Sequence, residues 1–395
     1  MKSITKFLAV LIFAALAHPN PASAQHYTET VLVSNFTVPN QTPVPDSNLQ
    51  NPWGLVASPT SPWWVANNAG GTSTLYDATG LTLSPPSVPP VAIVPINGNG
   101  IVTIPSAPSQ NGAAGSPTGI MSNGNVAVFH LPNGNPARFI FVTEDGTVQG
   151  WAGGTTATIV VDNSVKPDAA NGAVYKGATV AEIDGKEYIL AANFRSGRVD
   201  IFDSTFKQVQ LGKKDFDGDG DRDSRAPFDD DSIPKDFAPF NIQGIGPNIY
   251  ITYAKQDAAK HDPVGGAGLG FVDVFTSEGR RLQRLQHGTW FNAPWGTVLA
   301  SSNFGEFSHV ILIGNFRGGT IAAFNPVTGR FMGNVLNPDG STLNIDGLWG
   351  LQFGNGGSAG PAETLFFTAG PNGEKDGLFG TLTPITSELN EKDEQ

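Results

Sequence analysis

Six copies of one sequence unit follow one another along this 395-residue chain. Each copy opens with a Pro-aromatic-Gly-apolar stretch or a variant of it, continues into a second apolar segment that ends at a polar residue, turns through Gly and closes on a third apolar segment. The aligned glycines, on average about 59 residues apart, are Gly54, Gly119, Gly177, Gly244, Gly296 and Gly350. A repeat of this length suits a four-stranded unit with its loops.

Short apolar segments bounded by Gly, Pro, Asn and Asp predict antiparallel strands. Six such sheets around an axis form a six-bladed β-propeller, an all-β fold of four-stranded antiparallel blades. The composition agrees, because 48 Gly and 30 Pro supply many turns and only 15% of the residues are charged. Two β-sandwich domains are the rival all-β fold, and they would not explain six copies of one motif.

The run from Tyr27 to Phe36 lies outside the six units and alternates as a strand does. The sixth unit shows only three strands, from Asp346 to Pro384. We therefore expect the N-terminal run to supply the outer strand of the last blade and to close the ring. A closed ring leaves no sheet edge for a partner to cover, which favours a monomer.

Residues 1–24 are expected to be a signal peptide. Lys2 and Lys6 precede an apolar run, and Ala22-Ser-Ala24 has the form of a signal-peptidase site. The expected organisation is a propeller domain over residues 25–385 and a polar tail over 386–395, in a secreted or periplasmic protein without a membrane anchor. Because the chain has no Cys, its rigidity must come from packing, ring closure or a metal.

The net charge is -12, with 35 acidic and 23 basic residues. This balance disfavours nucleic acid or an anionic membrane as the main partner. A small molecule, a glycan or a peptide is the expected kind of ligand.

An acidic insertion, residues 213–232, separates the third and fourth units. Its D-x-D-x-D-G spacing is typical of loops that wrap Ca²⁺ with carboxylate oxygens. Ala226 stands where an EF-hand has its bidentate Glu, so we expect a bare, structural calcium loop, with a solvated acidic spacer as the alternative. The expected metal ligands are Asp215, Asp217, Asp219, Asp221 and Asp223, with Asp229, Asp230 or Asp231 to close the site.

Two sets of loops share one face of a propeller, namely the starts of the innermost strands and the turns between the second and third strands. Binding residues concentrate on loops that a rigid scaffold holds. The two copies of Asn-Phe-Arg present guanidinium forks that suit carboxylate or phosphate, and the Trp residues offer surfaces for stacking a sugar. Bracing and packing between blades is the alternative role for both. The candidate ligand-binding residues are Asn68, Asn193, Arg195, Asn241, Lys255, Asn315, Arg317, Trp53, Trp295 and Trp349.

A second hypothesis is a metal-dependent hydrolase, lactonase or lyase that acts at the central opening, with a second divalent metal in the channel. Its candidate catalytic residues are Glu144, Asp145 and His261, which offer acid, base or metal-ligand chemistry. His261 lies in AKQDAAKHDPVGG, an insertion of the fourth unit that could fold over the central face.

The motifs APFNIQ, NAPWG, GNF and GLWGL resemble those of an uncharacterised family of exported bacterial β-propellers, over roughly Asn51 to Gly380. The blade pattern is also similar to NHL-type propellers and, more distantly, to the gluconolactonase and streptogramin-lyase group. The last resemblance implies a divalent metal held by Glu, Asn and Asp at strand starts, where this chain offers Asn241, Asn292 and Asp346.

Overall fold

The computed structural model describes residues 25–78, 92–93, 100–112, 114–212, 226–385 and 388. The predicted signal peptide and most of the predicted polar tail lie outside the described residues. So do the five predicted calcium ligands, Asp215, Asp217, Asp219, Asp221 and Asp223.

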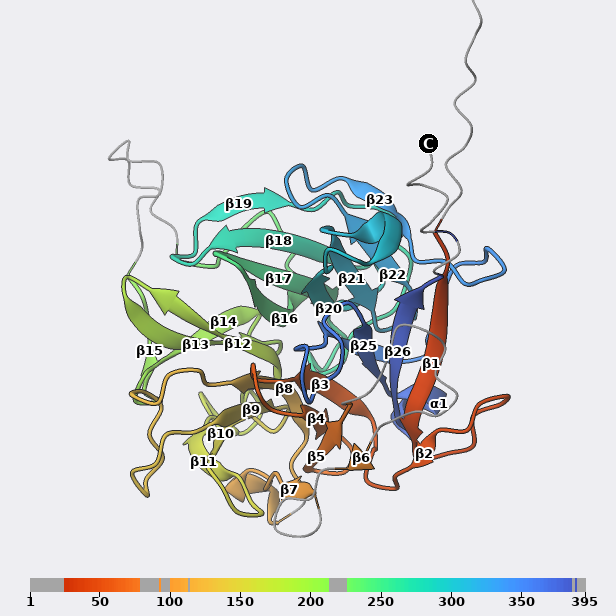
Figure 1. Cartoon of the computed structure of the whole chain (residues 1–395). Helices are drawn as coiled ribbons and strands as arrows, with labels where there is room; N and C mark the ends of the chain where they lie inside the picture. The colour runs from red at the N-terminus through yellow and green to blue at the C-terminus, as the bar shows by residue number, and fades with distance from the viewer. Residues whose placement is uncertain are drawn as a thin grey trace, which may run out of the picture.

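Six antiparallel sheets stand radially around one axis (Figure 1), which confirms the predicted six-bladed propeller. Blade 1 contains β3 (Pro52–Val56), β4 (Trp63–Asn67) and β5 (Thr72–Asp77), with β6 (Ala92–Ile93) and β7 (Ile101–Thr103) on its outer edge. Blade 2 contains β8 (Pro117–Ser122), β9 (Phe139–Thr143), β10 (Thr147–Trp151) and β11 (Thr158–Asp162). Blade 3 contains β12 (Tyr175–Ile183), β13 (Lys186–Asn193), β14 (Arg198–Asp203) and β15 (Gln208–Val209).

Blade 4 contains β16 (Phe237–Ile245), β17 (Asn248–Lys255), β18 (Phe271–Thr276) and β19 (Arg281–Arg284). Blade 5 contains β20 (Pro294–Leu299), β21 (Ile311–Asn315), β22 (Ile321–Phe324) and β23 (Phe331–Asn334). Blade 6 contains β24 (Leu348–Phe353), β25 (Leu365–Ala369), β26 (Leu378–Pro384) and β1 (Tyr27–Ser34), with β2 (Val44–Pro45) parallel to β1. The helical elements of the described residues are the 3-10 turns Pro108–Gln110 and Gly305–Phe307 and the single turn α1 (Pro371–Glu374). Among these elements no helix is long and apolar enough to cross a membrane.

Strand β1 closes the ring, as predicted. It pairs antiparallel with β26 from Tyr27 opposite Pro384 to Ser34 opposite Leu378, and Figure 1 shows β1 and β26 side by side in blade 6. The Tyr27 side chain is buried, and its hydroxyl donates a hydrogen bond to the Phe304 carbonyl of blade 5 at 2.9 Å. The N-terminal strand therefore joins the last blade to its neighbour.

The repeated glycines mark places where the innermost strands of adjacent blades nearly touch. A Cβ atom at Gly54 would lie 2.4 Å from the Thr118 carbonyl oxygen, and one at Gly296 would lie 2.5 Å from that of Trp349. Only glycine leaves room for this approach. The aligned Gly244 of blade 4 is an exception, because a Cβ there would be 3.4 Å from the nearest atom. Asn241 faces the next blade instead and donates its side-chain amide to the Trp295 carbonyl at 2.9 Å.

Candidate functional site

An aromatic floor fills the axis of the propeller. Trp53 stacks on Trp349 with ring centroids 3.5 Å apart, Trp349 stacks on Phe316 at 3.8 Å, and Trp295 meets Trp53 edge-on at 6.2 Å. Phe240 packs against Trp53 and Trp349. All of these rings are buried. The structure thus places the three predicted Trp residues in the floor, where they pack on one another.

Lys176 stands directly above this floor. Its Nζ atom lies 5.2 Å from the centroid of the Trp53 ring and 5.7 Å from that of Phe194, distances at which a cation is attracted by an aromatic face. Its side chain is 0% exposed. Two carboxylates neutralise the ammonium group, that of Glu144 in direct contact and that of Asp262 at 3.3 Å.

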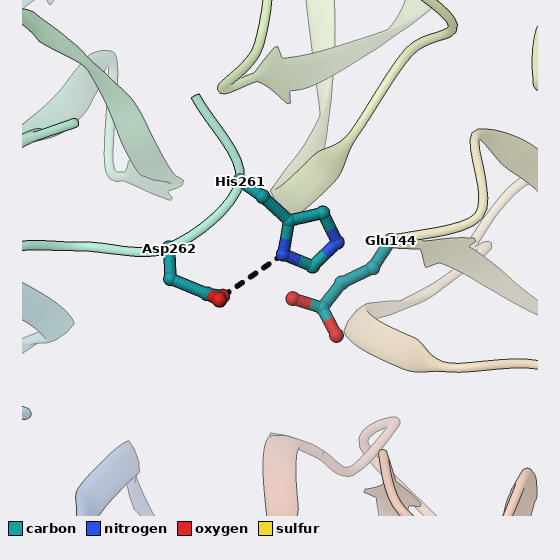
Figure 2. A group of neighbouring side chains, drawn as sticks. All are labelled: Glu144, His261 and Asp262. Atoms are coloured by element: carbon teal, nitrogen blue, oxygen red, sulfur yellow. Dashed lines mark hydrogen bonds and ion pairs between the residues drawn. The ribbon is translucent and has the colours of Figure 1, made fainter. Parts of the chain in front are cut away.

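The insertion between β17 and β18 brings His261 and Asp262 over the central face. Figure 2 shows both side chains directed toward Glu144, and the imidazole Nδ1 of His261 lies 3.0 Å from an Asp262 carboxylate oxygen. The Asp257 carboxylate holds the turn by accepting a hydrogen bond from the His261 backbone amide at 2.8 Å. The hydrogen bond with His261, helped by the charge of Lys176, lowers the pKa of Asp262 below its ordinary value.

Blades 5, 6 and 1 supply the opposite rim. The guanidinium carbon of Arg317 lies 4.5 Å from the centroid of the Phe316 ring, and its Nη2 atom is 4.0 Å from a Glu374 carboxylate oxygen. Glu374 accepts a hydrogen bond from the Asn51 amide at 3.0 Å, and burial raises the pKa of its carboxyl group. Asn68 donates its amide to Glu144 at 2.8 Å, which connects the two rims.

Other predicted residues make their contacts within the scaffold. Asp145 accepts hydrogen bonds from the backbone amides of Ala107 at 2.5 Å and Ser116 at 3.2 Å. The remaining contacts are these: Asn193 donates to Asp200 at 2.8 Å, Asn315 to the Trp290 carbonyl at 2.9 Å and Arg195 to the Gly172 carbonyl at 3.1 Å, while Lys255 pairs with Asp236 at 3.2 Å. Asn68, Glu144, His261 and Arg317 are the predicted residues that the structure brings into the central cluster.

Lys176, Asp262 and Glu374 were not among the predicted site residues. Lys176 carried a readable signal, because it occupies the position held by Trp53, Trp295 and Trp349 in other copies of the repeat. A charged residue in an aromatic position of a repeat indicates a role outside the blade's own packing. Asp262 and Glu374 lie in loops, and nothing in the sequence relates them to Lys176.

The chemistry of the cluster suits an ammonium group better than a metal ion. Ligand atoms of Glu144, His261 and Asp262 lie within 4.8 Å of one another, which is the spacing of a metal site. The Nζ atom of Lys176, however, already contacts both carboxylates. A divalent cation there would face the ammonium charge at close range in a poorly solvated place. The residues that the resemblance implied as ligands each hold a separate backbone group: Asn241 that of Trp295, Asn292 that of Gly266 and Asp346 that of Asn372.

Below the floor, the axis narrows to a cavity of about 20 Å³. The repeated glycines Gly54, Gly119, Gly296 and Gly350 line it together with Asn241. This volume suits a single water molecule. A separate cavity of about 390 Å³ lies between blades 3 and 4, where Phe228, Asp229 and Tyr253 are among its lining residues.

Relatives of this chain occur in a virus. Uncharacterized protein R648 of Acanthamoeba polyphaga mimivirus is 30% identical over 361 residues, which cover 89% of this chain and 78% of that protein. Protein L690 of the same virus is 29% identical over 352 residues, covering 85% of this chain and 81% of that protein. The bacterial origin and the export implied by the motif resemblance stay predictions.

Solved structures resemble the chain only distantly, and no family model matches it. A glucose dehydrogenase has a TM-score of 0.49 and 12% identity, covering 90% of this chain and 99% of that one. A Bacteroides thetaiotaomicron protein of unknown function has a TM-score of 0.48 and 12% identity, covering 92% and 76%. We infer no activity from structural similarity at this level. The relationship that the sequence does establish is with the mimivirus proteins, and the chain belongs to the family of R648.

Proposed function

We propose that the central face is a binding site for a small polar molecule that carries an anionic group, in a protein that is exported and stabilised by calcium at its acidic loop. Arg317 is the observation that carries the proposal. Its side chain is 39% exposed, it makes no hydrogen bond among the described residues, and its nearest carboxylate oxygen is 4.0 Å away. A guanidinium group held over an aromatic ring, with its donors open, suits a carboxylate or phosphate.

The rest of the cluster offers partners for hydroxyl groups. His261 and Asp262 are accessible at the mouth, and Glu374 lies beside Arg317 with a carboxyl group whose pKa is raised by burial. Carboxyl and imidazole groups accept and donate hydrogen bonds according to their protonation state. An acidic sugar, which combines one carboxylate with several hydroxyl groups, fits this set.

The test is a calorimetric titration with glucuronate and, as a neutral match, glucose. We expect glucuronate to bind more tightly, and we expect Arg317→Met to weaken its binding at least tenfold. Lys255→Met is the control, because the ion pair of Lys255 is with Asp236 and not with a residue of the cluster. Equal affinity for the two sugars, or full glucuronate affinity in Arg317→Met, would exclude an anion site at Arg317.

A metal-dependent hydrolase is the second candidate, favoured by the spacing of Glu144, His261 and Asp262. Lys176 argues against it, because its ammonium group would have to lose a proton or move aside. Titration with Mn²⁺ and Zn²⁺ separates the two proposals. We expect Glu144→Gln to leave metal binding unchanged, whereas loss of one binding event in that variant would favour the hydrolase.

A further inference from the structure

We propose that Lys176 and Glu144 become joined by an isopeptide bond, an amide between the lysine Nζ and the glutamate Cδ. The two side chains come from different blades, and the Nζ atom contacts a Glu144 carboxylate oxygen directly. Lys176 is at the start of β12 in blade 3, and Glu144 is in the turn between β9 and β10 of blade 2. The inference concerns the scaffold and does not depend on the proposed ligand.

The surroundings of Lys176 keep water away from its side chain. The side chain is 0% exposed and lies over the rings of Trp53 and Phe194. Excluding water from a site prevents hydrolysis of a bond that forms there, so an amide between the two side chains would persist. The nitrogen of a lysine side chain is a nucleophile for carbonyl carbon once it has given up a proton.

Two neighbouring groups supply the remaining parts of an acyl-transfer site. Asp262 lies 3.3 Å from the Nζ atom and can accept and return its protons, while His261 holds that carboxylate in place at 3.0 Å. The Asn68 amide donates to the second Glu144 oxygen at 2.8 Å, where negative charge develops when the carboxyl carbon is attacked. Fixing nucleophile, electrophile and base in one geometry removes most of the entropic barrier.

The reaction is a condensation without any oxidant or cofactor. One proton passes from the ammonium group to the Glu144 carboxylate through Asp262, giving an amine and a carboxylic acid. The nitrogen lone pair forms a bond to Cδ, and the carbonyl electron pair moves to the oxygen that Asn68 contacts. Asp262 then transfers a second nitrogen proton to the hydroxyl group, the carbon–oxygen bond breaks, and water leaves as the carbonyl re-forms. Asp262 ends in its original state.

A cross-link here would serve a chain that has no Cys. It would connect two blades across a separation of 32 residues. A covalent link of that span reduces the freedom of the unfolded chain, as a disulfide does.

Intact-mass measurement of the purified full chain tests the proposal. We expect the wild-type protein to be lighter than its sequence predicts by the mass of one water molecule, and Lys176→Met to have its full calculated mass. Asp262→Asn keeps both linked residues but removes the base, so we expect it also to have its full mass. A wild-type protein at its full calculated mass would show that the two residues form only an ion pair.

Peptide mapping locates the bond and excludes a cyclised Asp, which also loses water. Lys166 precedes Pro167, so trypsin leaves residues 139–176 in one peptide, and a linked Lys176 extends it to Lys186. A protease that cuts after Trp151 separates the two residues along the chain. We expect a branched fragment that contains both, whereas two unlinked fragments would overturn the assignment.

Discussion

Lys176 has a different role from the residues at the same position in other copies of the repeat. In blades 1, 5 and 6 the same position holds Trp53, Trp295 and Trp349, which pack on one another at the axis. Lys176 instead places a cation above these rings and gathers Glu144 and Asp262 around it. A buried charge contributes little to stability compared with an apolar residue of similar size. The presence of a buried lysine above the floor therefore points to a role other than stability.

The glycines of the innermost strands give a prediction at the level of single residues. Gly54→Ala places a methyl group 2.4 Å from the Thr118 carbonyl oxygen of the next blade. Overpacking of this kind costs about 1–3 kcal/mol, and the rigid backbone neighbour favours the upper end. Urea denaturation monitored by tryptophan fluorescence measures the loss.

Gly124 offers the matched control for Gly54. A Cβ atom at Gly124 meets nothing within 4 Å, so Gly124→Ala should leave the free energy of unfolding unchanged or raise it slightly. Similar losses in the two variants would show that close contact between blades is not the reason for the glycine.

At the scale of elements, two insertions depart from the regular blade. The segment between β17 and β18 lies over the axis and delivers His261 and Asp262. The segment before β16 contains the acidic loop, and its described end is tied to blade 4. Asp230 accepts charged hydrogen bonds from Arg281 at 2.7 Å and from Arg284 at 2.6 Å, with its own side chain 0% exposed. Asp230 is therefore engaged in the scaffold and not free to close a calcium site.

Removing the Asp230 carboxylate should loosen this attachment. Asp230→Ala leaves two guanidinium groups without one of their partners. We expect the free energy of unfolding to fall by about 2–4 kcal/mol, because the carboxylate is buried while the arginines are partly solvated. Asp236→Ala breaks the exposed ion pair with Lys255 and should lower the free energy of unfolding by less than about 1 kcal/mol. Chemical denaturation measures the free energy of unfolding of both variants. Equal losses would contradict a stabilising role for the buried network.

The acidic loop gives a prediction that the described residues leave open. If Asp217 and Asp219 hold Ca²⁺, EGTA should lower the melting temperature, since a ligand that binds only the native state stabilises it. Added Ca²⁺ should restore the melting temperature. The double variant Asp217→Ala plus Asp219→Ala should melt at the same temperature with and without EGTA. A wild-type melting curve that EGTA does not change would rule out a calcium clamp.

The whole molecule depends on closure of its ring by β1. The seven residue pairs between β1 and β26 are contacts between the two ends of the chain, and Val31, Leu32 and Val33 are buried there. Without β1, the edge of β26 would be open and the apolar groups beneath it would face water.

Truncation tests the closure. A chain that begins at Val38 should lose its cooperative thermal transition and bind an apolar dye, because several buried side chains and one strand ladder are missing. A chain that begins at Gln25 keeps β1 and should melt as the full 395-residue chain does. A peptide of residues 25–37 should restore part of the transition in trans. An unchanged melting curve for the shorter chain would mean that the ring is stable when open.

Local chemistry explains why the fold could be predicted. Alternation of apolar residues, turn residues and glycines at blade contacts are short-range patterns, and they repeat with the blade. They indicated six blades, the closing strand and the face that carries loops. Blade 4 departs from the pattern, because Asn241 and not the aligned Gly244 faces the next blade there.

The central cluster could be predicted only in part, because its members are distant in the sequence. Two copies of Asn-Phe-Arg illustrate the difficulty. Arg195 donates to the Gly172 carbonyl, whereas Arg317 keeps its donors open beside Glu374. Identical local sequences predict identical local shape, and the neighbours from other blades decide which arginine stays available.

By itself, the sequence determined a propeller closed by its N-terminal strand, since these properties follow from periodicity and turn chemistry within each unit. The tertiary structure alone decided that Glu144, Lys176 and Asp262 meet above an aromatic floor, because their contacts depend on how three blades and one insertion converge at the axis. Charges interact through space and not along the chain, so only the folded ring shows which of them become partners.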